Sequence, residues 1–122
     1  MIKLLQRTRR PDITFCRNGR ISLTARVVRL LSLRPGDGIN IVFHLDECYL
    51  TASRNAGAIG RHIASCHPTK KGSLNYCANS VLLARLMLER CNVRERRASF
   101  IVGKEEVIDG EVYLPIIYKM PL

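Results

Sequence analysis

The sequence has no tryptophan, and aromatic residues make up only 6% of its 122 residues. Proteins that bind single-stranded nucleic acid stack bases on aromatic side chains, so this scarcity favours a duplex over a single strand as a nucleic-acid partner. No apolar run approaches the ~18 residues of a membrane span. The basic N-terminus also lacks the apolar stretch and cleavage site of a secretory signal. We therefore expect a cytoplasmic protein with no membrane partner.

Cysteine is present without the spacing of a disulfide framework or a zinc ribbon. The five cysteines are an odd number and include no C-x-x-C pair. Cys66, His67 and Cys77 could together supply metal ligands, but reduced, half-buried cysteines of a cytosolic protein explain them more simply. The sequence therefore predicts no metal and no cofactor.

Motifs of catalysis are missing as well. The sequence contains no Ser/His/Asp or Cys/His order, no glycine loop for phosphate and no H-E-x-x-H pattern. Five acidic residues fall between Glu95 and Glu111, where they cluster around turns, as is typical of a solvated surface. We expect the protein not to be an enzyme.

Basic residues are in clear excess. Lys and Arg number 20 against 10 Asp and Glu, and the net charge is +10. An excess of this size on a small chain points to a polyanionic partner, of which nucleic acid is the first candidate. Because hydrophobic residues make up 47% of the chain, it can bury a core and is not a disordered basic tail.

The first half of the chain has the pattern of two strand pairs separated by a short helix. Apolar and polar residues alternate in 12–17, and Asn18-Gly19 is a strong signal for a two-residue hairpin turn. Thr24 can cap a helix, and Pro35-Gly36 cannot continue one. The predicted elements are strands 12–17 and 20–23, a helix over 25–32, and strands 39–45 and 48–52 around a turn at Asp46-Glu47.

The second half repeats this order after a glycine-containing linker at 54–60. Asp109-Gly110 is another hairpin signal, and Pro115 places the last strand at an edge or a bulge. The predicted elements are strands 62–67 and 73–76 around a turn at Lys70-Lys71-Gly72, a helix over 80–91, and strands 98–102 and 111–118. The apolar residues of the longer helix are expected in the core: Val81, Leu82, Leu83, Leu86 and Met87.

Matching residues in the two halves indicate an internal duplication. The first change of offset is seven residues, or two helical turns, so the helix lengthens while its apolar face turns by only about 20°. We therefore predict one domain over 1–122, with a first unit at 8–53 and a second, diverged unit at 61–119. The matches are Gly19 with Gly72 at an offset of 53, Leu33 with Val93 at 60, and Tyr49 with Tyr113 at 64.

Three consecutive segments of the first unit form an ordered pattern: Asn18-Gly19-Arg20-Ile21-Ser22-Leu23, the helix at 27–33, and Arg34-Pro35-Gly36-Asp37-Gly38-Ile39-Asn40-Ile41. This Gly-Arg-Ile strand, short helix, Leu-x-x-Gly-Asp turn and following strand resemble the AbrB-like, swapped-hairpin family of small prokaryotic DNA-binding proteins, which includes MazE and MraZ. The second unit departs from the pattern, with Arg96-Arg97 in place of the Gly-Asp turn.

In the AbrB-like family, two strand–helix–strand units interlock their hairpins into one barrel, normally by dimerisation. The resemblance therefore implies a mainly β, α+β fold with two short helices. It also implies that both units of this single chain form the swapped-hairpin barrel as a pseudo-dimer. Such a chain would be a monomer, or would pair again as a homodimer through an exposed edge strand.

The hairpin tips of the two units differ in charge. The first hairpins carry basic residues, and the second hairpins carry six of the ten acidic residues. If the first hairpins lie side by side, as the resemblance implies, one face is basic and the opposite face acidic, which suits one-sided docking on phosphates. The expected DNA-binding residues are Arg7, Arg9, Arg10, Arg17, Arg20, Arg61, Lys70 and Lys71.

Three functions from different classes remain open, in this order. The first is a duplex-DNA-binding protein, a small prokaryotic transcriptional regulator that docks its basic hairpins on phosphates. The second is an antitoxin-like protein-interaction module that binds a protein partner through its acidic hairpins or its Met120-Pro121-Leu122 tail. The third is a metal-dependent enzyme that uses Cys66, His67 and Cys77.

Overall fold

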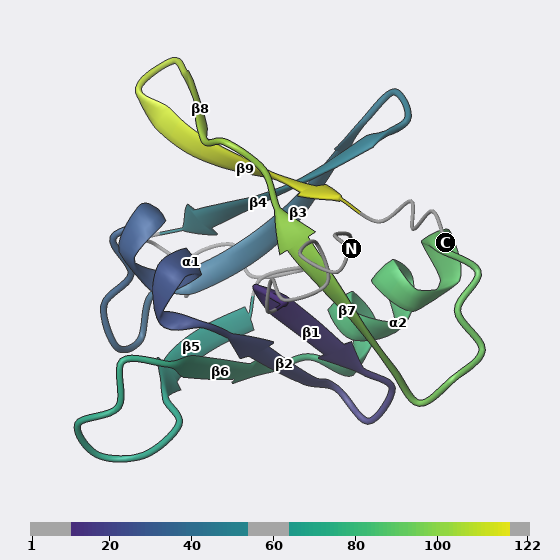
Figure 1. Cartoon of the computed structure of the whole chain (residues 1–122), viewed down its shortest axis with the longest axis horizontal. Coiled ribbons are helices and arrows are strands. Elements are labelled where there is room, and N and C mark those ends of the chain that lie inside the picture. Colours follow the sequence, from purple (N-terminus) through teal and green to yellow (C-terminus); the bar gives the residue numbers. More distant parts are fainter. Residues whose placement is uncertain (1–10, 54–63, 118–122) are drawn as a thin grey trace, which may run out of the picture.

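The computed structural model describes residues 11–53 and 64–117. The linker predicted at 54–60 therefore lies outside the described residues. Within them the chain forms nine strands and two helices (Figure 1), namely β1 (Ile13–Cys16), β2 (Arg20–Leu23), α1 (Ala25–Leu30), β3 (Gly38–His44), β4 (Glu47–Ser53), β5 (Ala64–Pro68), β6 (Tyr76–Asn79), α2 (Val81–Arg90), β7 (Arg97–Val102), β8 (Glu106–Ile108) and β9 (Glu111–Ile117).

Eight of these strands form a closed antiparallel barrel. In the order β4-β3-β5-β6-β2-β1-β7-β9, each strand pairs with the next, and β4 also pairs with β9, which closes the ring. β8 pairs with β9 and extends that hairpin away from the rest of the molecule (Figure 1). The barrel and its two short helices confirm the predicted mainly β, α+β class.

The strand order interleaves the two halves of the chain. The β1–β2 hairpin lies between β6 and β7 of the second half. The β5–β6 hairpin lies between β3 and β2 of the first half. Because each of these hairpins is hydrogen-bonded on both sides to strands of the other half, neither half has a closed sheet by itself.

The core fills the inside of the barrel with alternating strand residues. Ile13, Phe15, Ile21 and Leu23 are each at most 1% exposed, as the period-2 pattern of β1 and β2 requires. The ring of Phe15 meets that of Phe100 edge to face, with centroids 5.9 Å apart. This packing joins the first hairpin to β7 through the core as well as through backbone hydrogen bonds.

The helix α2 buries only one side, which corrects the prediction for its apolar residues. Leu83 and Met87 are buried as predicted, but Val81, Leu82 and Leu86 are 48%, 54% and 37% exposed. The helical period explains this difference, because the buried stripe Leu83, Ala84, Met87 and Leu88 leaves the residues on the opposite side in solvent. No helix in 11–53 or 64–117 is long and apolar enough to cross a membrane.

The helix caps relate the two halves differently from the sequence alignment. The N-caps are Thr24 and Ser80, an offset of 56, and the positive-φ residues that follow the helices are Ser32 and Asn92, an offset of 60. The helix therefore grows by four residues rather than seven. The strands before the helices, β2 and β6, also differ by 56, so Gly19 corresponds to Asn75 and not, as predicted, to Gly72 in the wider β5–β6 loop.

The caps of the two helices also differ in chemistry. Ser80 caps α2 in the ordinary way, with its Oγ accepting from the Leu83 N–H. Thr24 stands at the N-cap position of α1, but its hydroxyl donates to the Asp12 carbonyl instead. The Ala25 N–H donates to the side-chain oxygen of Asn75 at 2.9 Å, so the second half caps the helix of the first.

Two predicted hairpin boundaries were wrong, and one strand was not predicted. The turn between β3 and β4 is Leu45-Asp46, one residue early, because the register pairs His44 with Glu47. The strand predicted at 73–76 begins only at Tyr76, since Thr69 and Ser73 bond with the Asn75 backbone to hold a wider loop. Residues 106–108 form β8, which has no alternating pattern because all three residues are exposed.

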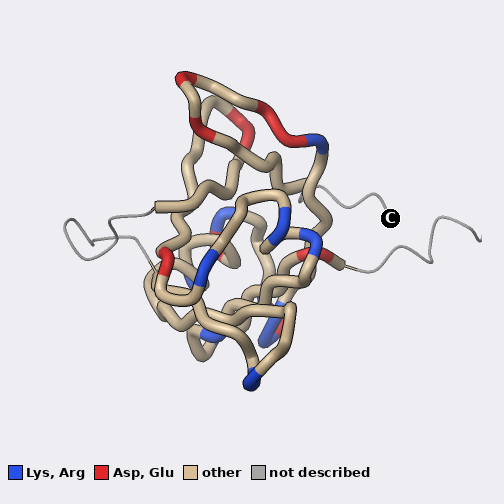
Figure 2. Tube along the Cα trace, turned by 90° about the vertical axis from the view of Figure 1, so that its left-hand side faces the viewer, with Lys and Arg blue, Asp and Glu red and all other residues tan. Residues whose placement is uncertain are grey.

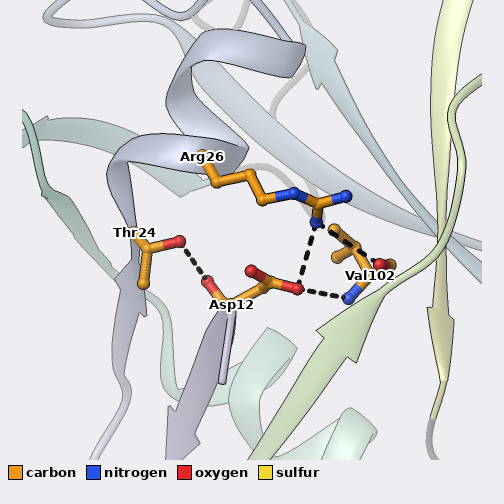
Figure 3. Close-up of polar contacts among 4 residues, drawn as sticks. All are labelled: Asp12, Thr24, Arg26 and Val102. Atoms are coloured by element: carbon orange, nitrogen blue, oxygen red, sulfur yellow. Dashed lines mark hydrogen bonds and ion pairs between the residues drawn. The ribbon is translucent and has the colours of Figure 1, made fainter. Parts of the chain in front are cut away.

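A buried carboxylate joins the first hairpin, α1 and β7 (Figure 3). Asp12 is 4% exposed, and its Oδ2 accepts from the Val102 N–H at 2.8 Å and from Arg26 Nη1 at 3.2 Å. Its backbone oxygen accepts from the Thr24 hydroxyl. Arg26 of α1 is therefore part of an ion pair with this carboxylate.

The buried Cys48 thiol is expected to resist alkylation. Burial, with a smaller contribution from Cys91, raises the pKa of Cys48 from 9.0 to about 12. The native thiolate fraction at pH 8 is then about a thousandfold lower than in the unfolded chain. The protonated thiol adds stability that is full below pH 9 and is lost as the pH rises toward 12. Mass-spectrometric mapping of native-state alkylation tests this, and labelling of Cys48 as fast as that of half-buried Cys16 would contradict it.

Candidate nucleic-acid interface

The two kinds of hairpin lie at opposite ends of the barrel. In Figure 1 the β1–β2 turn, the β5–β6 loop and the loop from α2 to β7 are at the bottom, and the β3–β4 and β8–β9 turns are at the top. We call the lower surface the basic end. Its exposed or half-exposed cationic residues are Arg17, Arg20, Lys70, Lys71, Arg94, Arg96 and Arg97.

The opposite surface, which we call the acidic end, carries the carboxylates. Figure 2 shows acidic residues gathered around the β8–β9 hairpin at the top of the view, with most Lys and Arg below. Tyr49 at this end donates its hydroxyl to Glu47 at 2.6 Å, and that hydrogen bond is the main cause of a tyrosine pKa raised to about 12. The acidic end comprises Asp46, Glu47, Glu105, Glu106, Asp109 and Glu111.

Antiparallel pairing of β2 with β6 joins the first hairpins of the two halves, with their tips pointing in opposite directions. β2 pairs with β6 from Arg20 opposite Asn79 to Leu23 opposite Tyr76. Arg20 and the loop residues Lys70 and Lys71 are all exposed. The tip that carries Arg20 and the loop that carries Lys70 and Lys71 therefore lie beyond opposite ends of this strand pair, although both are on the lower side of the barrel in Figure 1. Four of the predicted DNA-binding residues, Arg7, Arg9, Arg10 and Arg61, lie outside the described residues.

Arg17 has a different position from the one its predicted role suggests. Its guanidinium is bonded to backbone oxygens of the loop after α2: Nη2 donates to the Val93 oxygen at 2.7 Å, and Nε and Nη2 donate to the Glu95 oxygen at 3.3 and 3.1 Å. The Arg17 N–H also donates to the Arg96 oxygen at 2.7 Å. Three of its five side-chain donors thus fix the loop against the first hairpin.

An open pocket of 680 Å³ lies beside Arg17, between the first hairpin, α2 and the loop 91–96. We call it the arginine pocket. Among the described residues no carboxylate lies within 4 Å of its four guanidinium groups, and Glu95 of the same loop does not line it. Such a pocket can bind an anion by paired N–H donors. Its lining residues are Cys16, Arg17, Asn18, Arg85, Arg96 and Arg97.

The sequence did not single out Arg85, Arg96 or Arg97 as site residues. One signal for the last two was present, since Arg96-Arg97 stands where the first half has Gly36-Asp37. Arg85 had no local signal. It joins the pocket because α2 crosses the β1–β2 turn, where Arg85 Nε donates to the Arg17 oxygen at 3.4 Å.

The candidate metal ligands do not converge. His67 and Cys77 are directly opposite in the β5–β6 ladder, but the neighbouring Cys66 is fully buried on the other face of the strand. The Cys66 thiol donates to the Asp37 oxygen at 3.2 Å. Within the described residues no group of three or more His, Cys, Asp or Glu side chains could hold a metal ion.

Comparisons with known proteins assign no family to this arrangement. No protein-family model, no curated protein and no solved structure matches the chain.

Proposed function

We propose that this protein binds duplex DNA by docking its basic end on the phosphates, as a small transcriptional regulator of the AbrB-like type. The observation that carries the proposal is the separation of charge between the two ends of the barrel (Figure 2). Such a dipole orients the molecule toward a polyanion before contact, and it keeps the acidic hairpins away from the phosphates.

The interleaved strands support the AbrB-like part of the proposal. Each first hairpin is flanked by strands of the other half. The central pairs, β2 with β6 and β4 with β9, join equivalent strands of the two halves. This is the arrangement that a fusion of two swapped-hairpin units produces. A chain built in this way satisfies its own hairpins and needs no second copy to close the barrel.

The aromatic residues favour a duplex over a single strand. Phe15 and Phe100 are buried against each other, and Tyr49 and Tyr113 pair with each other away from the basic end. Among the described residues the basic end presents no exposed aromatic ring on which a base could stack. Binding through phosphate contacts from Arg and Lys remains, and such contacts are strongly salt-dependent.

The proposal is tested by fluorescence anisotropy of a labelled random duplex at several salt concentrations. We expect a log–log slope of about −4 to −6, because each phosphate contact contributes about −0.9 and the basic end presents roughly that many cations. Weak binding without salt dependence would contradict the proposal. Sequence selection from a random pool would then identify an operator if one exists.

A second function, protein binding, is favoured by one observation. Val81, Leu82 and Leu86 form an exposed apolar strip on α2. An antitoxin-like interaction module would use such a strip, and it would bind a protein partner with little salt-sensitive affinity for DNA. The double variant Leu82→Ser/Leu86→Ser separates the two functions. It should leave DNA binding within about twofold, because neither side chain carries charge for a phosphate contact.

A further inference from the structure

The arginine pocket is more than part of a diffuse positive surface, because its donors converge on one hollow. We propose that it holds one phosphate group of the nucleic-acid backbone, a proposal that rests on DNA binding at the basic end. Its 680 Å³ exceeds what one phosphate needs, so a phosphodiester with its flanking sugars can enter.

The hydrogen bonds divide the arginines into one positioning residue and three contact residues. Arg17 spends its Nε and Nη2 donors on the Val93 and Glu95 oxygens, which leaves the two Nη1 N–H groups without an acceptor among the described residues. Arg85 uses only Nε, toward the Arg17 oxygen. Arg96 and Arg97 are exposed at the rim.

A neutral donor completes the pocket. The side-chain oxygen of Asn18 accepts from the Arg20 N–H at 3.0 Å, so its amide NH₂ is the group left to donate. Oxyanions are bound well by a mixture of bidentate guanidinium groups and neutral N–H donors. The lining offers this mixture and no acceptor carboxylate to compete with a phosphate.

The counterpart of the arginine pocket, where the loop after α1 meets the β5–β6 hairpin, is built differently. There the Cys66 N–H of the hairpin donates to the Asp37 oxygen of the loop, as the Arg17 N–H donates to the Arg96 oxygen at the arginine pocket. Its turn carries Asp37, whose carboxylate accepts from the Arg34 N–H at 2.8 Å. The loop of this counterpart therefore carries an acidic side chain, whereas the loop at the arginine pocket lines it with Arg96 and Arg97. No Asp or Glu lines the arginine pocket itself. We therefore expect a phosphate to bind in the arginine pocket and not at its counterpart.

Cys16 gives the pocket a direct probe. It lines the hollow and is half-buried, and Cys77 on β6 is equally half-buried but does not line it. Alkylation of both thiols with iodoacetamide, followed by mass spectrometry, is measured for the full chain alone, with inorganic phosphate, and with a 20-bp duplex. We expect the duplex to slow labelling of Cys16 at least fivefold and labelling of Cys77 less than twofold. Inorganic phosphate should protect Cys16 in the same way at millimolar concentration.

Matched variants identify the residues responsible. Arg96→Ala/Arg97→Ala should remove the protection of Cys16 and weaken duplex binding about tenfold. Arg29→Ala/Arg34→Ala removes the same charge at two exposed arginines outside the basic end and outside the lining, and should change either measurement by less than twofold. Arg96→Lys/Arg97→Lys keeps the charge but loses the bidentate geometry, so protection should be restored only in part.

Each outcome decides one of the two proposals. Duplex binding without protection of Cys16 would overturn the phosphate pocket and leave the proposed function standing. Protection by inorganic phosphate without any duplex binding would overturn the proposed function and leave a pocket for free phosphate. Equal losses in the Arg29/Arg34 and Arg96/Arg97 variants would show that only net charge matters, and would also overturn the pocket.

Discussion

The triple variant Arg20→Ala/Lys70→Ala/Lys71→Ala is expected to bind duplex DNA roughly 30-fold more weakly than the parent chain at about 0.1 M salt, with a log–log slope smaller in magnitude by about 2.7. These residues come from both first hairpins and lie at the basic end. Their side chains form no hydrogen bond or ion pair with the described residues, so the fold should not change. Anisotropy titrations at several salt concentrations measure both quantities.

A charge-matched control removes net charge at the acidic end. Leu45→Asp/Lys104→Glu also lowers the net charge by three, and both positions are exposed. Leu45 has a φ of 57°, which aspartate tolerates better than leucine. Because this change is far from the proposed contact, affinity should fall no more than about threefold. Equal losses in the two variants would mean that net charge, and not the basic end, determines binding.

Asp12→Ala is expected to destabilise the protein by about 3 kcal/mol, since it removes a buried carboxylate and leaves the Val102 N–H without its acceptor. At this chain length the midpoint of thermal unfolding would fall by about 12 °C. The Asp12 contacts drawn in Figure 3 link the first hairpin, α1 and β7, so their loss affects strands of both halves. Calorimetry or urea unfolding gives the value.

Two further variants show how that stability is divided. Asp12→Asn keeps an acceptor for Val102 and should cost about half as much. Arg26→Ala removes only a cation whose side chain is 39% exposed, and should cost about 1 kcal/mol. If Asp12→Ala lowers the free energy of unfolding by less than about 0.5 kcal/mol, the Asp12 carboxylate contributes little to stability and this account of it is wrong.

Local signals in the sequence were sufficient for most of the fold. The alternation in 12–17 predicted β1, and Asp109-Gly110 predicted the two-residue turn between β8 and β9. Asn18-Gly19 predicted a turn that is present but spans three residues, 17–19, instead of two. These signals work because a strand's face and a two-residue turn depend on neighbouring residues alone. These local signals were enough to predict the order of the elements along the chain, with two strand pairs around each helix.

Features that depend on distant contacts were not predictable in this way. The exposed side of α2 depends on which face meets the barrel, so Leu82 and Leu86 were misplaced. Arg17 looked like a free surface cation, yet its partners are backbone oxygens some 76 to 78 positions away. Arg85 belongs to the arginine pocket only because α2 crosses the first hairpin. The residues next to Arg85 in the sequence give no signal of this contact.

The most direct test of the account is a ¹⁵N–¹H NMR titration of the full chain with a 20-bp duplex, because it reports which end of the barrel contacts DNA. Binding through the basic end predicts shifts of the backbone amides in 16–20, 69–73 and 94–97. The amides of 45–47 and 105–111 at the acidic end should stay in place. Shifts confined to the acidic end or to the exposed strip of α2, or none at low salt, would contradict DNA docking through the basic hairpins.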